Sequence, residues 1–330
     1  MSDAVRLSVV IPFHNSQRTL DKCLESVERA LGGGMEVLLV DDASEDGSAA
    51  TAGRYPFRLI TMDRQRGPAA ARNRGADEAR GELLLFVDAD VVLRPDTIEQ
   101  LLATYRARPN IAGASAIYSD RPVLPGWFQQ FKAMEEACKY AAYRGEKYSA
   151  FDTHCGSVRR DVFLELGGFN TAYAGADTED LEFGHALAAT HRNCINPEAV
   201  VDHHHACFRR GLWNYCRRSF HWARMFVERP LFDEAVTTRA NGASVLLACA
   251  AAAAFCGAIV YAPLAWAALA AAVAFVIWNR AFVGLVVRKT RYSAVWLVPV
   301  FLLFMFALQI AVGAGALAGL VYGAARRLSP

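Results

Sequence analysis

Residues 241–330 contain no acidic side chain, and this absence divides the chain into two parts. All 33 Asp and Glu residues precede Asn241, whereas six basic residues follow it. The whole chain has a net charge of +2 and is 54% hydrophobic, which is too apolar for a disordered chain and too balanced for a nucleic-acid binder. The sequence therefore predicts a water-soluble domain followed by a segment that lies in a different solvent.

Three apolar stretches make up the second part. The first, Ala243–Ala262, has 20 residues and no charge, which is enough to cross roughly 30 Å of hydrocarbon at about 1.5 Å per residue. Pro263 marks a break, Leu264–Val287 is the second stretch, and Ala294–Ala325 is the third. We expect residues 241–330 to form about three transmembrane helices; a buried soluble helix bundle is the alternative.

The basic residues indicate how these helices are oriented. The first two stretches would form a hairpin that returns the loop Arg288–Arg291 to the side of the soluble domain, as the positive-inside bias prefers. A third span would place Arg326 and Arg327 on the opposite side, which the same bias disfavours. The alternative is that the last stretch begins as an interfacial segment, with a kink at Pro299.

Three glycines of the last stretch recur at every fourth residue. They are Gly315, Gly319 and Gly323. A stripe of this kind would let another helix pack closely.

The segment between the two parts, residues 208–240, interleaves basic and aromatic side chains. These are Arg209, Arg210, Arg217, Arg218, Arg224, Trp213, Tyr215, Phe220, Trp222 and Phe226. Together they predict an amphipathic helix that lies in the lipid headgroup layer. A nucleic-acid patch is the alternative.

The N-terminal sequence and the cysteines point to the cytoplasm. The apolar run Leu7–Ile11 stops at Pro12, which is too short for an export signal. Eight cysteines are scattered without a CxxC spacing, as in a reducing compartment. We expect a multi-pass protein of the cell membrane whose soluble domain is cytoplasmic.

Four short apolar runs alternate with helical patterns in the soluble part. The runs are residues 7–11, 36–40, 57–61 and 83–87, and the helical patterns are residues 18–31, a short piece after Asp46, and residues 68–80. Alternation of this kind predicts a parallel α/β sheet with right-handed crossovers. Ligands of such sheets bind beyond the carboxyl ends of the strands, where this sequence places its polar residues.

Asp88 and Asp90 follow the last of these runs. Side chains at positions i and i+2 of an extended chain face the same way, so the two carboxylates can converge. Two adjacent carboxylates are costly without a cation, and a hard divalent ion whose shell is completed by phosphate oxygens would satisfy them. The alternative is that Asp88 caps a turn and Asp90 is solvated.

Seven motifs in one order resemble those of the family 2 glycosyltransferases over roughly residues 5–225. The motifs are Val9–Asn15, Val40–Ser44, Gly67–Gly75, Phe86–Asp90, Gly156–Ser157 with Gly167–Phe169, Thr178–Leu181 and Pro197–His203. The resemblance implies the GT-A fold, a Rossmann-like mixed α/β sheet, over residues 1–207. It also implies a Mg²⁺ or Mn²⁺ cofactor and a nucleotide-sugar donor.

The resemblance also implies roles for individual residues. Asp42, with Asp41 beside it, would contact the uracil of a UDP-sugar. Arg72, with Asn73, would belong to the donor site, where a helix that begins at Gly67 can face an anion; a surface ion pair is the alternative for Arg72. The same nucleotide-sugar site would include Pro12, Asn15, Asp88, Ala89, Gly156 and Glu179.

The resemblance also implies which residues bind the metal and which residue is the catalytic base. Asp90, assisted by Asp88, would hold the ion, with His203 as a further ligand, His204 and His205 as alternatives, and a purely structural His203 also open. Asp180 matches the base that takes the proton of an acceptor hydroxyl; simple capping of the following helix is the alternative.

The expected function is inverting, metal-dependent transfer of a single sugar from a nucleotide-sugar, expected to be a UDP-sugar. The acceptor would be a hydroxyl of a lipid or lipid-linked molecule, bordered by residues 122–148. The chain lacks the Gln-x-x-Arg-Trp segment of processive synthases, since Arg217–Trp222 does not match it. Two alternatives are a polyprenyl-phosphate glycosyltransferase and a catalytically silent membrane scaffold that binds nucleotide-sugars.

Overall fold

The structure, a computed structural model, describes residues 6–142, 148–172, 178–228, 239–290 and 296–328. The chain divides into two compact units. The N-terminal unit comprises residues 1–124 and 140–205, and the C-terminal unit comprises residues 125–139 and 206–330. In this division residues 125–139 belong to the C-terminal unit, whereas the sequence-based division into 1–207, 208–240 and 241–330 left them in the soluble domain.

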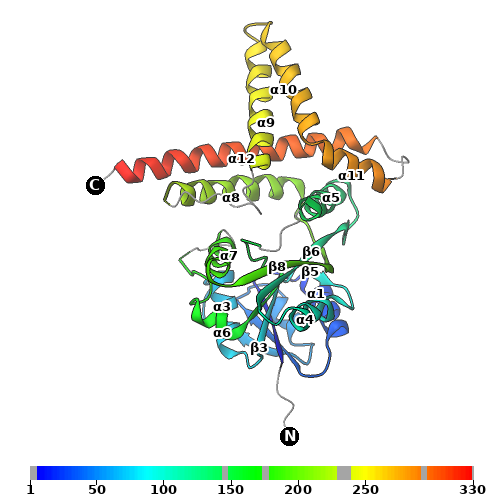
Figure 1. Ribbon diagram of the computed structural model, residues 1–330, viewed down its shortest axis with the longest axis vertical. Coiled ribbons are helices and arrows are strands. Elements are labelled where there is room, and N and C mark those ends of the chain that lie inside the picture. Colours follow the sequence, from blue (N-terminus) through cyan, green and yellow to red (C-terminus); the bar gives the residue numbers. More distant parts are fainter. Residues whose placement is uncertain (1–5, 143–147, 173–177, 229–238, 291–295, 329–330) are drawn as a thin grey trace. The chain divides into compact units, whose positions relative to one another are not determined.

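The N-terminal unit contains one eight-stranded sheet in the order β3-β2-β1-β4-β7-β6-β8-β5 (Figure 1). All four predicted strands are confirmed, and they pair in parallel. They are β1 (Leu7–Phe13), β2 (Met35–Asp41), β3 (Arg58–Thr61) and β4 (Leu83–Val87). The side chains of β1, β2 and β4 are mostly buried, as expected of strands covered on both faces, whereas in β3 only Ile60 is buried.

The other half of the sheet makes it mixed, as the GT-A resemblance implies. β7 pairs antiparallel with β4 and with β6, β6 runs parallel to β8, and β5 pairs antiparallel with β8. Their bounds are β5 (Val91–Leu93), β6 (Ile111–Pro122), β7 (Cys155–Arg159) and β8 (Arg192–His203). β8 returns the chain to the loop after β4, so residues more than 100 positions apart meet at one edge.

The expected helices are confirmed as α1 (Leu20–Ala30), α2 (Ser48–Ala52) and α3 (Pro68–Glu78), and further helices are α4 (Thr97–Ala107), α6 (Arg160–Glu165) and α7 (Glu179–Thr190). Alternate side chains of β1 enter different cores, since Val9 packs with Leu24 of α1 whereas Val10 packs with Ala76 of α3. A Cβ atom at Gly75 would lie 2.3 Å from Cγ1 of Val10, so glycine lets α3 approach the sheet closely.

The C-terminal unit is helical. Its helices are α5 (Trp127–Ala142, of which residues up to Lys139 belong to this unit), α8 (Phe208–Glu228), α9 (Arg239–Ala258), α10 (Leu264–Trp278), α11 (Arg280–Thr290) and α12 (Leu297–Leu328). Within the described residues, Asn241–Ala258 and Leu297–Ala325 are long and apolar enough to cross a membrane. The pair α10 and α11 would be a third span only if it counts as one, and it is bent by 59°.

The long helices of this unit run in two directions. α9 and α10 form an antiparallel hairpin, whereas α12 runs beside α8 and crosses the base of that hairpin (Figure 1). The glycine stripe of α12 does pack closely against another helix, as predicted, and that helix is α8.

Candidate active site

Asp88, Ala89 and Asp90 form the loop between β4 and β5. The backbone N–H of Asp88 donates to the His154 carbonyl at 3.1 Å, and that of Val91 donates to the Asp88 carbonyl at 3.0 Å, which closes a tight turn. Ala89 is buried, whereas the Asp88 and Asp90 side chains are 31% and 44% exposed. The turn therefore presents two carboxylates at the carboxyl edge of the sheet, as the sequence predicts.

Arg72 lies directly behind Asp88. Gly67, at a positive φ of 88°, precedes α3, and Pro68 begins it, so Arg72 sits in the second turn. Its guanidinium is 3% exposed and donates from Nη2 to Asp88 Oδ1 at 2.7 Å and from Nη1 to Glu179 Oε1 at 3.2 Å. Arg72 is therefore a buried bridge between two carboxylates, not a surface ion pair.

The partner of Arg72 begins α7. Glu179 is the first residue of this helix and is 2% exposed, whereas the next residue, Asp180, is partly exposed and accepts the Leu181 N–H at 2.8 Å. Burial by itself lowers the pKa of Arg72, but the charges of Asp88 and Glu179, with a smaller contribution from Asp180, outweigh it and raise that pKa. Arg72 thus stays charged and joins the start of α7 to the Asp88 loop.

The two loop carboxylates differ in their surroundings. Burial and the charge of Asp90 raise the pKa of Asp88 despite the opposing effect of Arg72. Burial acts in the same direction on Asp90, but His203 outweighs it, so the pKa of Asp90 lies below its ordinary value. One carboxylate is held by an arginine and the other by a histidine.

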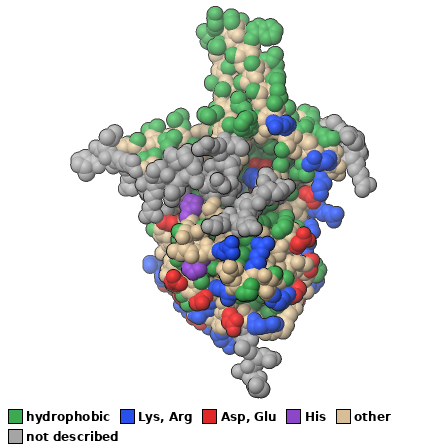
Figure 2. Space-filling view, viewed as in Figure 1, with side chains coloured by type: hydrophobic (Ala, Val, Ile, Leu, Met, Phe, Trp, Pro, Cys, Tyr) green, Lys and Arg blue, Asp and Glu red, His purple; other side chains and the backbone are tan. Residues whose placement is uncertain are grey.

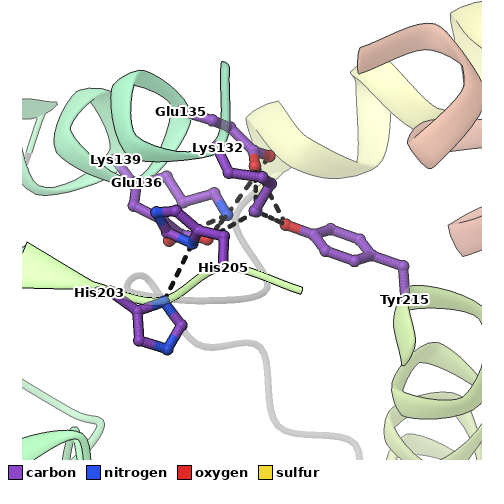
Figure 3. A network of polar contacts seen from close by, with 7 residues as sticks. All are labelled: Lys132, Glu135, Glu136, Lys139, His203, His205 and Tyr215. Atoms are coloured by element: carbon purple, nitrogen blue, oxygen red, sulfur yellow. Dashed lines mark hydrogen bonds and ion pairs between the residues drawn. The ribbon is translucent and has the colours of Figure 1, made fainter. Parts of the chain in front are cut away.

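His203 ends β8 opposite Val91 in the strand register. Its Nε2 lies 3.3 Å from Asp90 Oδ2, and its Nδ1 lies 3.0 Å from Nδ1 of His205. Figure 3 shows the rings of His203 and His205 joined by this contact. His204 is buried, and its backbone N–H donates to the Asp90 carbonyl at 2.9 Å. The late histidine segment is therefore tied to the Asp90 loop by side chain and backbone.

The family model described as "Glycosyl transferase family 2" matches residues 8–167, which include β1 from Ser8 onward, β2–β4 and the Asp88–Asp90 turn. The chain carries a family 2 glycosyltransferase domain. The match ends before Asp180 and His203. The roles expected of these two residues therefore depend on the resemblance of their own motifs and on their places in the structure.

Curated relatives of the family 2 domain align over part of their length. The succinoglycan biosynthesis protein ExoO of Rhizobium meliloti (strain 1021) is 36% identical over 121 residues, which are 36% of this chain and 34% of ExoO. A dolichol-phosphate mannosyltransferase of Pyrococcus furiosus is 30% identical over 113 residues, 33% of this chain and 32% of that relative. The chain thus matches about a third of each of these relatives.

A solved structure resembles most of the chain. The mannosyltransferase PcManGT of Pyrobaculum calidifontis, described in complex with GDP-Man and Mn²⁺, has a TM-score of 0.58 at 17% identity. The alignment covers 96% of this chain and 87% of that one. This likeness confirms the GT-A fold expected of the family 2 domain.

This fold family implies a divalent metal, and part of the predicted ligand set is suited to hold one. Asp90 and His203 point their donor atoms at one another across 3.3 Å, close enough for one ion to replace the contact. One carboxylate oxygen of Asp88, Oδ1, accepts a hydrogen bond from Arg72. Among the residues that the structure describes, no group of three His, Cys, Asp or Glu side chains is gathered for a metal. Asp90 and His203 therefore fit a divalent ion as two of its ligands.

Other predicted residues of the family 2 domain hold loops in place. Both oxygens of Asp42 accept backbone N–H groups, from Arg66 and Gly67, at 2.8 Å. Asp41 Oδ1 accepts the Ser44 N–H at 2.9 Å. These bonds shape the turn after β2 and the entry to α3. They leave the uracil contact expected of Asp42 as a prediction.

Asn15 and Pro12 lie at the end of β1. Asn15 has a positive φ of 49°, and its Oδ1 accepts the Glu45 N–H at 2.9 Å, so it joins the loops after β1 and β2. Pro12 is buried within β1.

Asn73 and Gly156 lie outside the Arg72–Asp88 network. The Asn73 amide exchanges two hydrogen bonds with the Phe169 backbone, at 2.8 and 2.9 Å. A Cβ atom at Gly156 would lie 2.5 Å from the Asp152 carbonyl oxygen. The contacts of both residues are with neighbouring backbone, so we leave them out of the donor site proposed below.

Sequence patterns missed several residues around the site. Tyr118 stacks on His154 with ring centroids 3.9 Å apart and also contacts the His203 ring at 4.9 Å. The Phe169 ring lies 5.7 Å from the Arg72 guanidinium carbon. Gly167-Gly168-Phe169 was a motif signal for Phe169, but nothing in the spacing of Tyr118 or His154 connects them to His203.

A second polar cluster belongs to the C-terminal unit. Lys132, from α5, is buried and contacts Glu135, Glu136 at 2.8 Å, and the Tyr215 hydroxyl of α8 (Figure 3). In the same unit Phe131 is fully buried with Phe282 and Phe301. Phe131, which lies within residues 122–148 that are expected to border the acceptor, is therefore part of an apolar core.

Proposed function

We propose that this protein is an inverting, metal-dependent glycosyltransferase that moves one sugar from a nucleotide-sugar to a hydroxyl of a lipid or lipid-linked acceptor. The observation that carries the proposal is the buried Arg72 bridge, which ties the start of α7, and so Asp180, to the Asp88–Asp90 turn. The Arg72 bridge supports a proposal in which the catalytic base and the diphosphate-binding site are held at a fixed distance from each other.

The residues divide the reaction between them. Asp180, at the partly exposed start of α7, accepts the proton of the acceptor hydroxyl while that oxygen forms its bond to the anomeric carbon. The bond from that carbon to the diphosphate breaks, and its electron pair leaves on the phosphate oxygen. Asp90 and His203 would hold Mg²⁺ or Mn²⁺, which offsets the charge of the leaving diphosphate when bound. Arg72 holds Asp88 in place and keeps positive charge behind the turn.

The nucleoside would lie beside the loops after β1 and β2. Asp41, Asp42 and Asn15 shape that edge, where open α/β sheets bind ligands. The donor in this proposal is a UDP-sugar. Two structural neighbours support a nucleotide-sugar and a metal in general terms, since their descriptions name GDP-Man with Mn²⁺ and UDP, GalNAc with Mn²⁺.

A second candidate is transfer to a polyprenyl phosphate. It is favoured by the names of two relatives, the Pyrococcus furiosus dolichol-phosphate mannosyltransferase and an undecaprenyl-phosphate 4-deoxy-4-formamido-L-arabinose transferase of Pseudomonas savastanoi. An acceptor phosphate is already ionised and needs no strong base, so this candidate makes Asp180 dispensable.

Asp180→Asn separates the two candidates. Transfer of radiolabelled sugar from nucleotide-sugars to lipid extracts should fall by about 10²–10⁴-fold, while calorimetric binding of nucleotide with Mn²⁺ should be unchanged. Asp77→Asn, an exposed carboxylate on α3, is the control. Full activity of Asp180→Asn would support the phosphate acceptor, and loss of nucleotide binding would show a structural role instead.

A further inference from the structure

The C-terminal unit turns its longest apolar helix, α12, away from the direction of the hairpin (Figure 1). The most apolar 18 residues within Leu297–Ala325 of α12 have a mean hydropathy of 2.4, higher than the 1.6 of Asn241–Ala258 in α9. By composition α12 is therefore the stronger candidate to cross a membrane. Yet α12 runs along α8 and across the base of the α9–α10 hairpin (Figure 1).

The seam between α8 and α12 has no room for side chains on the glycine face. A Cβ atom would lie 2.0 Å from the Cys216 carbonyl oxygen at Gly315 and 2.2 Å from the Phe220 carbonyl oxygen at Gly319. At Gly323 it would lie 3.2 Å from Val227 Cβ. The partner numbers rise together along both helices, so α8 and α12 are parallel, and Gly315 and Gly319 pack against the backbone of α8.

Aromatic and basic side chains extend the seam. The Tyr322 ring of α12 lies 5.6 Å from the Phe220 ring and 5.8 Å from the Arg224 guanidinium carbon, both of α8. Such contacts add to the packing of the glycines. The two helices therefore form one layer.

α8 is unsuited to cross a bilayer. Five arginines lie along its 21 residues, and each would be costly in hydrocarbon. Arg209, Arg210 and Arg218 are exposed, and so is Trp213. A helix with this composition lies in the headgroup layer, and a helix fastened along its backbone must lie there too.

The hairpin behaves differently. Asn279 Nδ2 donates to Ser244 Oγ at 3.0 Å and closes its base, and the 15 residues of α10 rise about 22 Å from there. Ile259 and Val260 at its tip are 82% and 91% exposed. Figure 2 shows the hairpin as a column of hydrophobic side chains, nearly free of charge. This column has the composition of a membrane-inserted element.

We propose that only the α9–α10 hairpin enters the bilayer, and that α12 lies in the membrane surface beside α8. Both ends of α12 then stay on the same side of the membrane as the N-terminal unit. Arg326 and Arg327 join Arg288 and Lys289 on that side, which agrees with the positive-inside bias that a third span would violate. The 32 residues of α12 extend about 48 Å, more than the roughly 30 Å needed to cross.

Protease protection of the full chain, tagged at both ends and expressed in Escherichia coli, tests this topology. Both tags should be digested in inside-out vesicles and both protected in intact spheroplasts. The N-terminal tag reports the side of the family 2 domain in the same molecules. Digestion of one tag without the other, in either preparation, would overturn the proposal, whatever the enzyme transfers.

The seam has a separate test with a matched control. Gly319→Leu places a side chain against the Phe220 backbone, whereas Ala318→Leu adds the same side chain at an exposed position of α12. The melting temperature in detergent should fall by about 4 °C or more for Gly319→Leu and by less than about 1 °C for Ala318→Leu. Equal melting temperatures for the two variants would contradict the pairing on which the topology rests.

Discussion

Arg72 Nη2 lies 2.7 Å from Asp88 Oδ1 in an ion pair that is buried on the arginine side. Asp88 therefore has one oxygen committed to the protein and one available to a ligand. The same guanidinium binds Glu179, so a displacement of α7 would also displace the Asp88 turn. This bridge connects the expected base of the reaction to the expected metal site.

Removing Glu179 should destabilise the fold. Glu179→Ala leaves the buried Arg72 guanidinium with half of its compensating charge, which costs about 3–5 kcal/mol in comparable cases. Chemical denaturation followed by circular dichroism would measure the free energy of unfolding. Glu99→Ala, which breaks an exposed pair with Arg106, should change it by less than about 0.5 kcal/mol. Similar losses for both variants would refute a special role of the bridge.

Metal removal should weaken nucleotide binding. In calorimetry, EDTA should lower the affinity for the nucleotide at least about ten-fold, and Mn²⁺ or Mg²⁺ should restore it, because the ion joins Asp90 to the diphosphate. Asp90→Ala should bind nucleotide equally well with and without metal. Asp96→Ala, at an exposed position before α4, should keep the metal dependence. Metal-dependent binding by Asp90→Ala would place the ion elsewhere.

Gly184 fixes how closely α7 approaches the neighbouring backbone. A Cβ atom there would lie 2.4 Å from the carbonyl carbon of Ala150, so Gly184→Ala should destabilise the protein by about 1–3 kcal/mol. A Cβ atom at Gly33 meets nothing within 4 Å, so Gly33→Ala should leave the stability almost unchanged. Thermal melting of both variants measures the difference. A neutral Gly184→Ala would mean that α7 can shift without loss.

The Lys132 cluster should matter for the C-terminal unit. Lys132→Met leaves the buried Glu135 and the partly exposed Glu136 without their central cation, and a loss of about 3 kcal/mol or more is expected. Lys139, whose side chain is 41% exposed, offers the matched control, and Lys139→Met should cost less than about 1 kcal/mol. Tryptophan fluorescence reports on this unit, because all six tryptophans lie in it.

Glu36 should contribute a pH-dependent part of the stability. Burial by itself raises the pKa of Glu36, but hydrogen bonds from Ser8 and Arg80 outweigh it and hold the pKa below its ordinary value of 4.5. A lowered folded-state pKa stabilises the protein above the ordinary value, and that stabilisation is lost as the pH falls through the folded-state value. The difference in unfolding free energy between the parent chain and Glu36→Gln should therefore be constant from pH 6 to 8 and shrink below about pH 4.5. A difference that grows on acidification would contradict this assignment.

The sequence by itself determined the elements whose signals are local. The apolar runs of β1, β2 and β4 are buried on both faces, so composition alone marks them. The Asp88–Asp90 pair follows directly from its place at the end of such a run. The hydrophobicity of residues 241–330 likewise needs no partner to be recognised.

The tertiary structure decided what depends on residues far apart in the chain. Glu179 binds Arg72 across 107 positions, and His203 reaches Asp90 only because β8 pairs with β5. The direction of α12 is a similar case. Hydropathy records that a helix avoids water but not which way it runs. That direction is set by the backbone on which its glycines pack, and here the backbone belongs to the arginine-rich α8.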